Sequence, residues 1–421
     1  MRRQGRELER LDLRALNRAT LERQLLLVRT QLPAVAAIQR TIALNAQTPN
    51  SPYLSLWSRL VDFQVEQLTH AIESRRVVRS ISLRATQRLT ATADYPWLRA
   101  VLAPLLRRVQ RNVFGRRLAN VEVEELAEAT RQLLAGQSLT RSELGRLLAE
   151  RWPAAERSAL AWSAQYLEPM LHPPPSGTWN VAPRSMPCVL ASDWLPDEEP
   201  SDGSKSPGEL LVRRYLQAYG PATVGDVRAW SGVSGLREVV DGMRTELREF
   251  ADQDGRTLID LPDLPRPDGD VPAPVRFLPE FDNLLLAYAN RRRVMSDDIR
   301  RAVCVGDAVA ATVLVDGTVA ATWSTAQRDG KTVLNVRPFS RWSRHDSMEV
   351  IDEGDEAARV CCSRRPGRRC PYRRLTRREG SAAGVEAPVA RQPGGWLRVP
   401  DHLGGLLLGL PGDLLCLVEQ F

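Results

Sequence analysis

The chain has 421 residues, of which 43% are hydrophobic and 26% charged, a balance typical of globular proteins and a length that predicts about three domains. No apolar run approaches the ~20 residues that span a bilayer, and the polar N-terminus lacks a secretion signal, so we expect a cytoplasmic protein without a membrane partner. The net charge of +7 suggests nucleic acid, but residues 364–378 alone hold eight arginines and no acid, so only local arginine clusters support that argument.

The N-terminal part of the chain predicts helices followed by a hairpin. Residues 11–40 favour three short helices, of which the second can be capped by Thr20 or a neighbour and the third can be opened by Pro33. An amphipathic helix is expected over residues 53–67, and the alternating, β-branched residues 77–93 indicate a strand or hairpin. Three helices and a hairpin are the plan of a winged-helix unit.

This plan recurs twice further along the chain. Thr140 begins a capping box within residues 120–153, and Thr223 begins another within residues 209–243. The second copy continues into strands that turn at Asp254-Gly255. Three winged-helix units in one chain are therefore expected.

Strand signals dominate from Val271 onward, with a hairpin turn at Asp316-Gly317 and an amphipathic helix near residues 346–360. The whole chain is thus predicted to be α+β, with a small β-rich domain after the winged-helix units. Beyond about residue 360 the sequence is rich in Arg, Gly and Pro and has no periodicity. Two interpretations stay open: a disordered basic tail that adds affinity for DNA, or a reading-frame slip that replaced a final strand.

The cysteines and histidines show no metal-binding pattern. Six cysteines include no CxxC pair, and none of the four histidines stands at zinc-ligand spacing. We therefore expect reduced thiols, no metal site and no other cofactor.

Two carboxamides, Asn45 and Gln47, end an otherwise apolar run. If the run is a strand, residues two apart point the same way, so both amides share one face. The alternative is that either side chain caps the helix expected to start near residues 51–53. Spacing alone leaves both readings open.

Four segments together resemble the actinobacterial winged-helix DNA-binding proteins related to the AlkZ/YcaQ-like DNA glycosylases. They are "LNAQTPNSPYLSLWSRL", "QAYGPATVGDVRAWSGVSG", "FLPEFDNLLLAYANRRRVM" and "LVDGTVAATWS". The resemblance covers roughly residues 11–355 and implies tandem winged-helix units around a DNA channel, followed by a β-rich domain. The expected divisions are 11–95, 96–185 and 205–265 for the winged-helix units, 271–355 for the β-rich domain and 360–421 for the tail.

The resemblance also implies removal of alkylated bases from DNA, in some members bulky adducts made by the producer's own genotoxic antibiotic. The family's catalytic Gln-x-Gln or Gln-x-Asp element aligns with Asn45-Ala46-Gln47, so Asn45 and Gln47 are the predicted catalytic residues. Asn45 is one methylene shorter than Gln, which reduces its reach by about 1.5 Å. Arg88 stands where relatives usually carry His.

Amides suit this chemistry because an N7-alkylated guanine already carries a positive charge and leaves without an acid. The enzyme then needs only to hold a water near the deoxyribose and to stabilise the oxocarbenium-like sugar. We expect the two amides to fix that water between them, since each offers an acceptor and two donors. No lysine lies near the motif to form a Schiff base, so a coupled strand-cleaving activity is not expected.

Nine further residues are predicted to contact DNA through phosphate, base or sugar. They are Arg84, Arg88, Asp282, Asn283, Arg291, Arg292, Arg293, Trp57 and Trp179. The leading hypothesis is a monomeric, nucleoid-associated, monofunctional glycosylase for bulky N7-alkylguanine or N3-alkyladenine in double-stranded DNA, with a role in antibiotic self-resistance. The alternative is a non-catalytic DNA-binding protein, either a transcription regulator or a lesion binder.

Overall fold

The structure, a computed structural model, describes residues 8–181, 186–196, 205–328 and 331–361. The segment after residue 361, for which the sequence offered two interpretations, lies outside these ranges. Among the described residues, no helix combines the length and the apolar character needed to cross a membrane.

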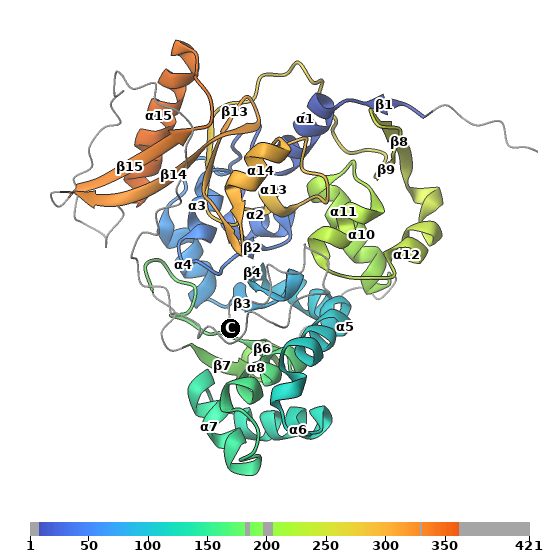
Figure 1. The fold of residues 1–421 in the computed structure, drawn as a ribbon, viewed down its shortest axis with the longest axis vertical. Coiled ribbons are helices and arrows are strands. Elements are labelled where there is room, and N and C mark those ends of the chain that lie inside the picture. Colours follow the sequence, from blue (N-terminus) through green and yellow to red (C-terminus); the bar gives the residue numbers. More distant parts are fainter. Residues whose placement is uncertain (1–7, 182–185, 197–204, 329–330, 362–421) are drawn as a thin grey trace, which may run out of the picture.

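Four helices and a three-stranded antiparallel sheet form the N-terminal part (Figure 1). The helices are α1 (Leu13–Arg23), α2 (Ala34–Thr41), α3 (Ser51–Trp57) and α4 (Val65–Glu73). The strands are β2 (Leu44–Asn45), β3 (Val77–Ile81) and β4 (Gln87–Ala91), in the order β2-β4-β3, and the 3₁₀ turns η1 (Leu83–Ala85) and η2 (Thr92–Asp94) follow β3 and β4. The hairpin predicted over residues 77–93 is confirmed by the pairing of β3 with β4.

The helix prediction was wrong in two places. Thr20 lies inside α1 and bonds the Leu16 carbonyl, so it caps no second helix. The chain leaves α1 at Leu25, whose φ of 58° is left-handed and stops helix propagation. The helix predicted over residues 53–67 is instead the two helices α3 and α4, separated by a turn in which Asp62 also has positive φ.

The middle of the chain forms two helical groups. The first contains the helices α5 (Tyr95–Phe114), η3 (Gly115–Arg117), α6 (Val123–Leu134), α7 (Arg141–Arg151), α8 (Arg157–Leu167) and α9 (Ala191–Trp194). Its sheet has the strand order β5-β7-β6, formed by β5 (Leu139–Thr140), β7 (Pro187–Leu190) and β6 (Met170–Leu171). The second contains α10 (Pro207–Tyr219), α11 (Val224–Ser231), α12 (Leu236–Gly242) and η4 (Arg244–Glu246). The capping boxes predicted at Thr140 and Thr223 are confirmed, since each hydroxyl accepts from the backbone N–H three residues on.

A hairpin follows the second helical group. Strands β8 (Arg248–Asp252) and β9 (Thr257–Asp260) pair antiparallel around the predicted turn, where Gly255 has a φ of 77°. The N-terminal strand β1 (Arg10–Leu11) adds to β8 in parallel, a pairing between segments far apart in the sequence that no local pattern predicted.

The C-terminal part is β-rich, as predicted. Its four-stranded antiparallel sheet has the order β10-β13-β14-β15, formed by Arg276–Leu278, Thr312–Val315, Thr318–Arg328 and Lys331–Pro338. The remaining elements are α13 (Asn283–Leu286), α14 (Asp297–Val303), the short pair β11 (Cys304–Val305) and β12 (Ala308–Val309), and α15 (Arg344–Cys361). The turn at Asp316-Gly317 is confirmed, with both residues at positive φ.

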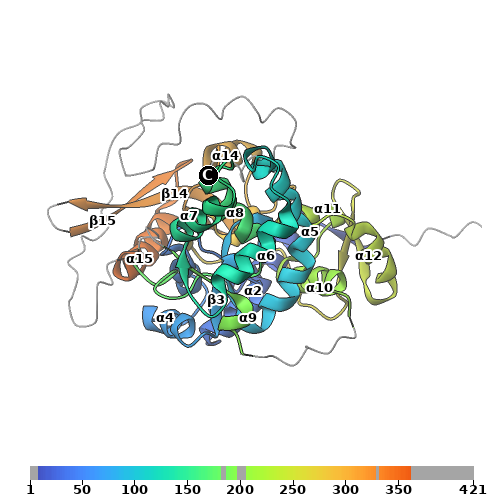
Figure 2. The same ribbon diagram turned by 90° about the horizontal axis from the view of Figure 1, so that it is seen from below.

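Hydrophobic cores cross the boundaries predicted between the units. Tyr53 and Leu56 of α3 share one core with Phe277, Trp323 and Val350 of the C-terminal sheet and α15. A second core joins α5–α8 to α10–α12. Helices α2 and α4 lie between the helical lobe of α6–α8 and the C-terminal sheet (Figure 1). Helix α12 and the β14–β15 hairpin lie at opposite sides of the molecule (Figure 2). The α+β class is confirmed; the winged-helix units and the DNA channel stay predictions.

A buried ion pair fixes α1 against strand β9. The guanidinium of Arg23 donates to both carboxylate oxygens of Asp260 at 2.7 and 2.8 Å, and both side chains are fully buried. Gly220 packs directly on this pair: a Cβ added there would lie 2.6 Å from Arg23 Nη1 and 2.6 Å from Asp260 Oδ1. The glycine is required for space, because its φ of −64° suits any residue.

We expect Gly220→Ala to lower the free energy of unfolding by roughly 1–3 kcal/mol, since the methyl group must displace a buried ion pair. The matched control is Gly225→Ala in α11, where the nearest atom to a new Cβ is at an ordinary 3.4 Å. That change should raise stability by roughly 0.5 kcal/mol through helix propensity. Urea denaturation of both variants measures the difference, and equal stability of the two would contradict the steric account.

Candidate active site

Strand β2 holds the amide motif at the edge of the N-terminal sheet. Leu44 pairs with Leu89 and Asn45 with Arg88 of β4, and the Ala46 N–H extends the ladder by donating to the Gln87 carbonyl at 3.0 Å. Directly paired residues point to the same face of a sheet. The side chains of Asn45 and Arg88 therefore share one face, which we call the amide face.

The two amides contact each other directly. Asn45 Nδ2 donates to Gln47 Oε1 at 2.6 Å, and Asn45 Oδ1 accepts from the Gln47 backbone N–H at 3.0 Å. The second contact is an Asx turn, in which a short amide side chain bonds the backbone two residues on. The expectation of a water between the two amides was wrong, because they are already within hydrogen-bond distance.

Neither amide caps the following helix. The N-cap residue of α3 is Asn50, which uses its side chain on Asn180 instead: Asn50 Nδ2 donates to Asn180 Oδ1 at 2.8 Å. The structure thus contradicts the capping alternative and leaves Asn45 and Gln47 as a pair held in a fixed orientation, with Asn45 only 5% exposed.

Arg88 is a buried cation on the amide face. Its Nη1 donates to Asn283 Oδ1 at 2.8 Å, and the Asn283 amide in turn donates to the carbonyl of Ala43, two residues before Asn45. Arg88 makes no ion pair with any described residue, and its Nε is buried without a hydrogen-bond partner. Burial, helped by the nearby charge of Arg84, lowers the pKa of the Arg88 guanidinium to about 10.

A second buried cation reaches the motif from the opposite face. Arg79 of β3 donates from Nη2 to the carbonyl of Ala46 at 2.8 Å and from Nη1 to Ser176 Oγ at 3.2 Å. Burial lowers its pKa to about 10 as well. Nearby, burial lowers the pKa of His172 to about 3, so this imidazole is neutral near pH 7. Positive charge therefore flanks the motif on both sides of the sheet.

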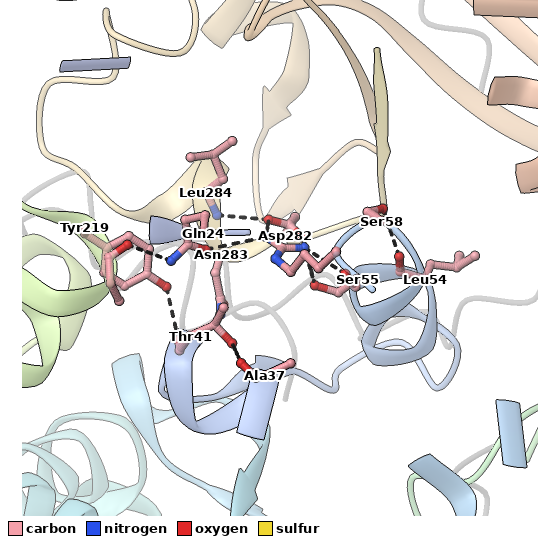
Figure 3. Close-up of polar contacts among 12 residues, drawn as sticks. Gln24, Ala37, Thr41, Leu54, Ser55, Ser58, Tyr219, Asp282, Asn283 and Leu284 are labelled. Carbon is pink, nitrogen blue, oxygen red and sulfur yellow. Dashed lines mark hydrogen bonds and ion pairs between the residues drawn. The ribbon is translucent and has the colours of Figure 1, made fainter. Parts of the chain in front are cut away.

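The segment that contacts the amide face is anchored by a second buried ion pair. Arg59 donates from Nη1 and Nη2 to the two carboxylate oxygens of Asp282, each at 2.9 Å, and both side chains are fully buried. Asp282 also accepts from Ser55 Oγ at 2.9 Å and, as the N-cap of α13, from the Leu284 N–H at 3.0 Å (Figure 3). The bonds from Ser55 and Arg59 join α3 and the residues just after it to the segment that follows β10.

Glu280 lies at the same place and was not singled out from the sequence. Its Oε2 accepts from the hydroxyl of Thr48, the residue after Gln47, at 3.2 Å. The side chain is half-buried, and burial raises the pKa of its carboxyl group. The segment "FLPEFDN" contains Glu280, but only the three-dimensional contact with Thr48 distinguishes this residue from an ordinary surface acid.

The nine residues predicted to contact DNA fall into different environments. Arg88, Asp282 and Asn283 gather around the amide motif with buried side chains, and Arg84 is also buried, with a bond to the Ala229 carbonyl. Trp57 is part of a hydrophobic core, and Trp179 packs edge-on against Tyr53 at 5.1 Å between ring centroids. A DNA contact stays a prediction for each of them.

The three adjacent arginines separate from the motif and from one another. Arg293 is buried against the Tyr288 ring and bonds the Pro221 carbonyl at 2.9 Å. Arg291 is half-buried beside Cys304, whereas Arg292 is exposed. Of the three, Arg292 is the one whose side chain is exposed to solvent for a phosphate contact. Among the described residues, no three of the His, Cys, Asp and Glu side chains gather as a potential metal site.

Comparison with known proteins gives the class of this chain. A family model described as "DNA glycosylase AlkZ-like" matches residues 38–360, more than half of the sequence. The chain therefore belongs to the AlkZ-like DNA glycosylases and is an enzyme that hydrolyses N-glycosyl bonds of DNA. The predicted family is confirmed.

Two comparisons name particular relatives. The chain is 26% identical over 362 residues to "Interstrand DNA cross-link repair glycosylase" of Streptomyces sahachiroi, covering 81% of this chain and 94% of that protein. The solved structure of Streptomyces sahachiroi DNA glycosylase AlkZ is similar, with a TM-score of 0.68 and 23% identity over 86% of this chain and 99% of that one. The structural likeness supports the mixed α+β fold described above.

We expect Asp282→Asn to lower the free energy of unfolding by about 3–5 kcal/mol, because Arg59 would stay buried without a counter-charge. The control is Glu124→Gln, which removes the acid from an ion pair with Arg107 whose partners are 71% and 55% exposed. Water already screens that pair, so its loss should leave stability nearly unchanged. Urea denaturation tests both, and a small effect of Asp282→Asn would show that the anchor is dispensable.

Proposed function

We propose that this DNA glycosylase is monofunctional and excises bulky N7-alkylguanine or N3-alkyladenine from double-stranded DNA, including adducts that form interstrand cross-links. The observation that carries the proposal is the Asn45–Gln47 contact, which holds together the amide pair that the sequence resemblance aligns with the family's catalytic motif. The name of the Streptomyces sahachiroi relative supports the cross-link substrate.

The reaction is a displacement at C1′ of the deoxyribose. A water held by the Gln47 amide attacks C1′ while the C1′–N bond breaks, and the electron pair of that bond neutralises the cationic alkylated base. Asn45 acts by orienting Gln47, because both hydrogen-bonding ends of the Asn45 amide are used on that residue. A positioned water and an alkylated base that leaves readily make a protonated general acid unnecessary.

A bulky adduct also sets how the lesion is reached. A base tethered to a large alkyl group, or to the opposite strand, does not fit a narrow extrusion pocket, so the sugar is attacked while the base stays in the stack. Such an enzyme acts as a monomer on duplex DNA at the nucleoid, and protection of a producer from its own DNA-alkylating antibiotic is the setting we propose.

Single-turnover release of N7-alkylguanine, small and bulky, from a duplex oligonucleotide tests this function. We expect abasic product from the wild type and a drop of at least ~100-fold in both Asn45→Ala and Gln47→Ala, which corresponds to ~2.7 kcal/mol of transition-state stabilisation. Gln31→Ala, an exposed amide on the turn before α2, is the matched control and should keep the wild-type rate.

Two results would contradict the proposal. Wild-type protein that binds duplex DNA in a salt-sensitive way but releases no base would be a binding protein on a glycosylase scaffold. Equal rates for the wild type and both alanine variants would place the reaction outside the amide pair.

A further inference from the structure

Two segments far apart in the sequence run side by side in opposite directions at the site. Asn283 bonds the carbonyl of Ala43, and Glu280 bonds the hydroxyl of Thr48. These contacts lie at the two ends of residues 43–48, with Asn45 and Gln47 between them. Because the order of the contacts is reversed, Glu280 lies at the Gln47 end of the motif.

The segment also lies on the correct face of the sheet. Asn45 and Arg88 are paired across β2 and β4, so their side chains point to the amide face. Arg88 bonds Asn283 on that face, at the start of α13. Residues 280–283 therefore lie against the face that carries the amides.

Glu280 and Asp282 are two residues apart but differ in their electrostatic surroundings. Asp282 is fully buried and neutralised by Arg59. Glu280 is half-buried, accepts a neutral hydroxyl and forms no ion pair with any described residue. No structural cation neutralises its negative charge, although two buried arginines that form no ion pair with a described residue, Arg79 and Arg88, lie on the two sides of the motif.

The backbone between the two acids is strained. Phe281 has a φ of 57°, in the left-handed region that costs a bulky residue energy. The conformation is held by the bonds of Asp282 and by the Phe281 N–H, which donates to the Val309 carbonyl at 3.3 Å. Strain of this kind persists where the surrounding structure fixes it, and here it directs Asp282 inward and leaves Glu280 at the motif.

We propose that Glu280 is a further catalytic residue, the carboxylate that accepts a proton from the attacking water and stabilises the positive charge that develops at C1′. This role rests on the function proposed above. As the water oxygen bonds C1′ and the C1′–N bond breaks, the water proton moves to a Glu280 carboxylate oxygen. The base leaves with the bonding electron pair, the product is an abasic site with a hydroxyl at C1′, and Glu280 returns the proton to solvent.

The charges of the site explain why a carboxylate is needed there. The departing base and the sugar share positive charge in the transition state, and the two buried arginines beside the motif disfavour such charge. Neutral amides orient a water but cannot offset this repulsion. A carboxylate on the amide face supplies both the missing negative charge and an acceptor for the proton.

Glu280→Gln tests the proposal, because it keeps the shape and the Thr48 contact but removes the charge. We expect the single-turnover rate of base release at saturating enzyme to fall at least ~100-fold, the size of a lost general base. Affinity for the lesion-containing duplex and thermal stability should match the wild type. Glu66→Gln, an exposed acid in the first turn of α4, is the matched control and should keep full activity.

A second variant separates catalysis from structure. Glu280→Ala leaves a space at the carboxylate, and added formate should raise its rate of base release while leaving the wild type and Glu66→Gln unchanged. A residue with only a structural role would not respond to a small free carboxylate. Absence of rescue together with full activity of Glu280→Gln would overturn the proposal.

The result is distinguishable from failure of the proposed function. Wild-type activity that is lost in Gln47→Ala but kept in Glu280→Gln would overturn the carboxylate role and retain the glycosylase. A wild type that releases no alkylated base would overturn both, because the carboxylate acts only on the water of that reaction.

Discussion

The buried pair of Arg59 and Asp282 is the interaction on which the site depends. It joins the end of α3, the helix that follows the amide motif in the chain, to a segment more than two hundred residues later, because Arg59 comes two residues after that helix. Removing both charges from water is costly, and only the bidentate geometry and the extra bonds from Ser55 and Leu284 compensate for it. Because a buried ion pair tolerates few geometries, it fixes the position of the segment that contains Asp282. Glu280 and Asn283, in the same segment, are therefore held beside β2.

Charge is distributed around the motif in a way that suits a cationic reaction on a polyanion. Arg79 and Arg88, which form no ion pair with a described residue, lie on opposite faces of the sheet beside the strand that carries the amides, and in the proposed function their positive potential favours approach of the DNA backbone. The same potential opposes the cationic sugar. The neutral amides cannot offset this repulsion between the arginines and a cationic sugar. In our proposal the negative charge comes from Glu280, in a neighbouring segment.

Local signals in the sequence were sufficient for much of the fold. The capping boxes at Thr140 and Thr223 and the turn at Asp316-Gly317 depend on neighbouring residues, and each was predicted from spacing alone. The strand pairing of β1 with β8 and the Arg88–Asn283 bond join residues roughly two hundred positions apart, and no local pattern encodes them. The amide motif was found because its neighbours resemble a family. Glu280 lies in one of the segments that carry this resemblance but was not recognised, since the role proposed for it depends on a contact with Thr48.

The shorter first amide has a physical explanation in this geometry. An Asn side chain places its oxygen where it can accept the N–H two residues on, which closes the Asx turn between Asn45 and Gln47. A Gln at the same position carries an extra methylene and does not close that ring. The Asn45 side chain is shorter than that of Gln, but its oxygen and its nitrogen both bond Gln47 and so fix the orientation of Gln47. Asn45 holds the Gln47 amide, and the Asp282 ion pair places Glu280 next to it. In the proposed site, the fixed orientation of Gln47 therefore matters more than the length of the side chain at position 45.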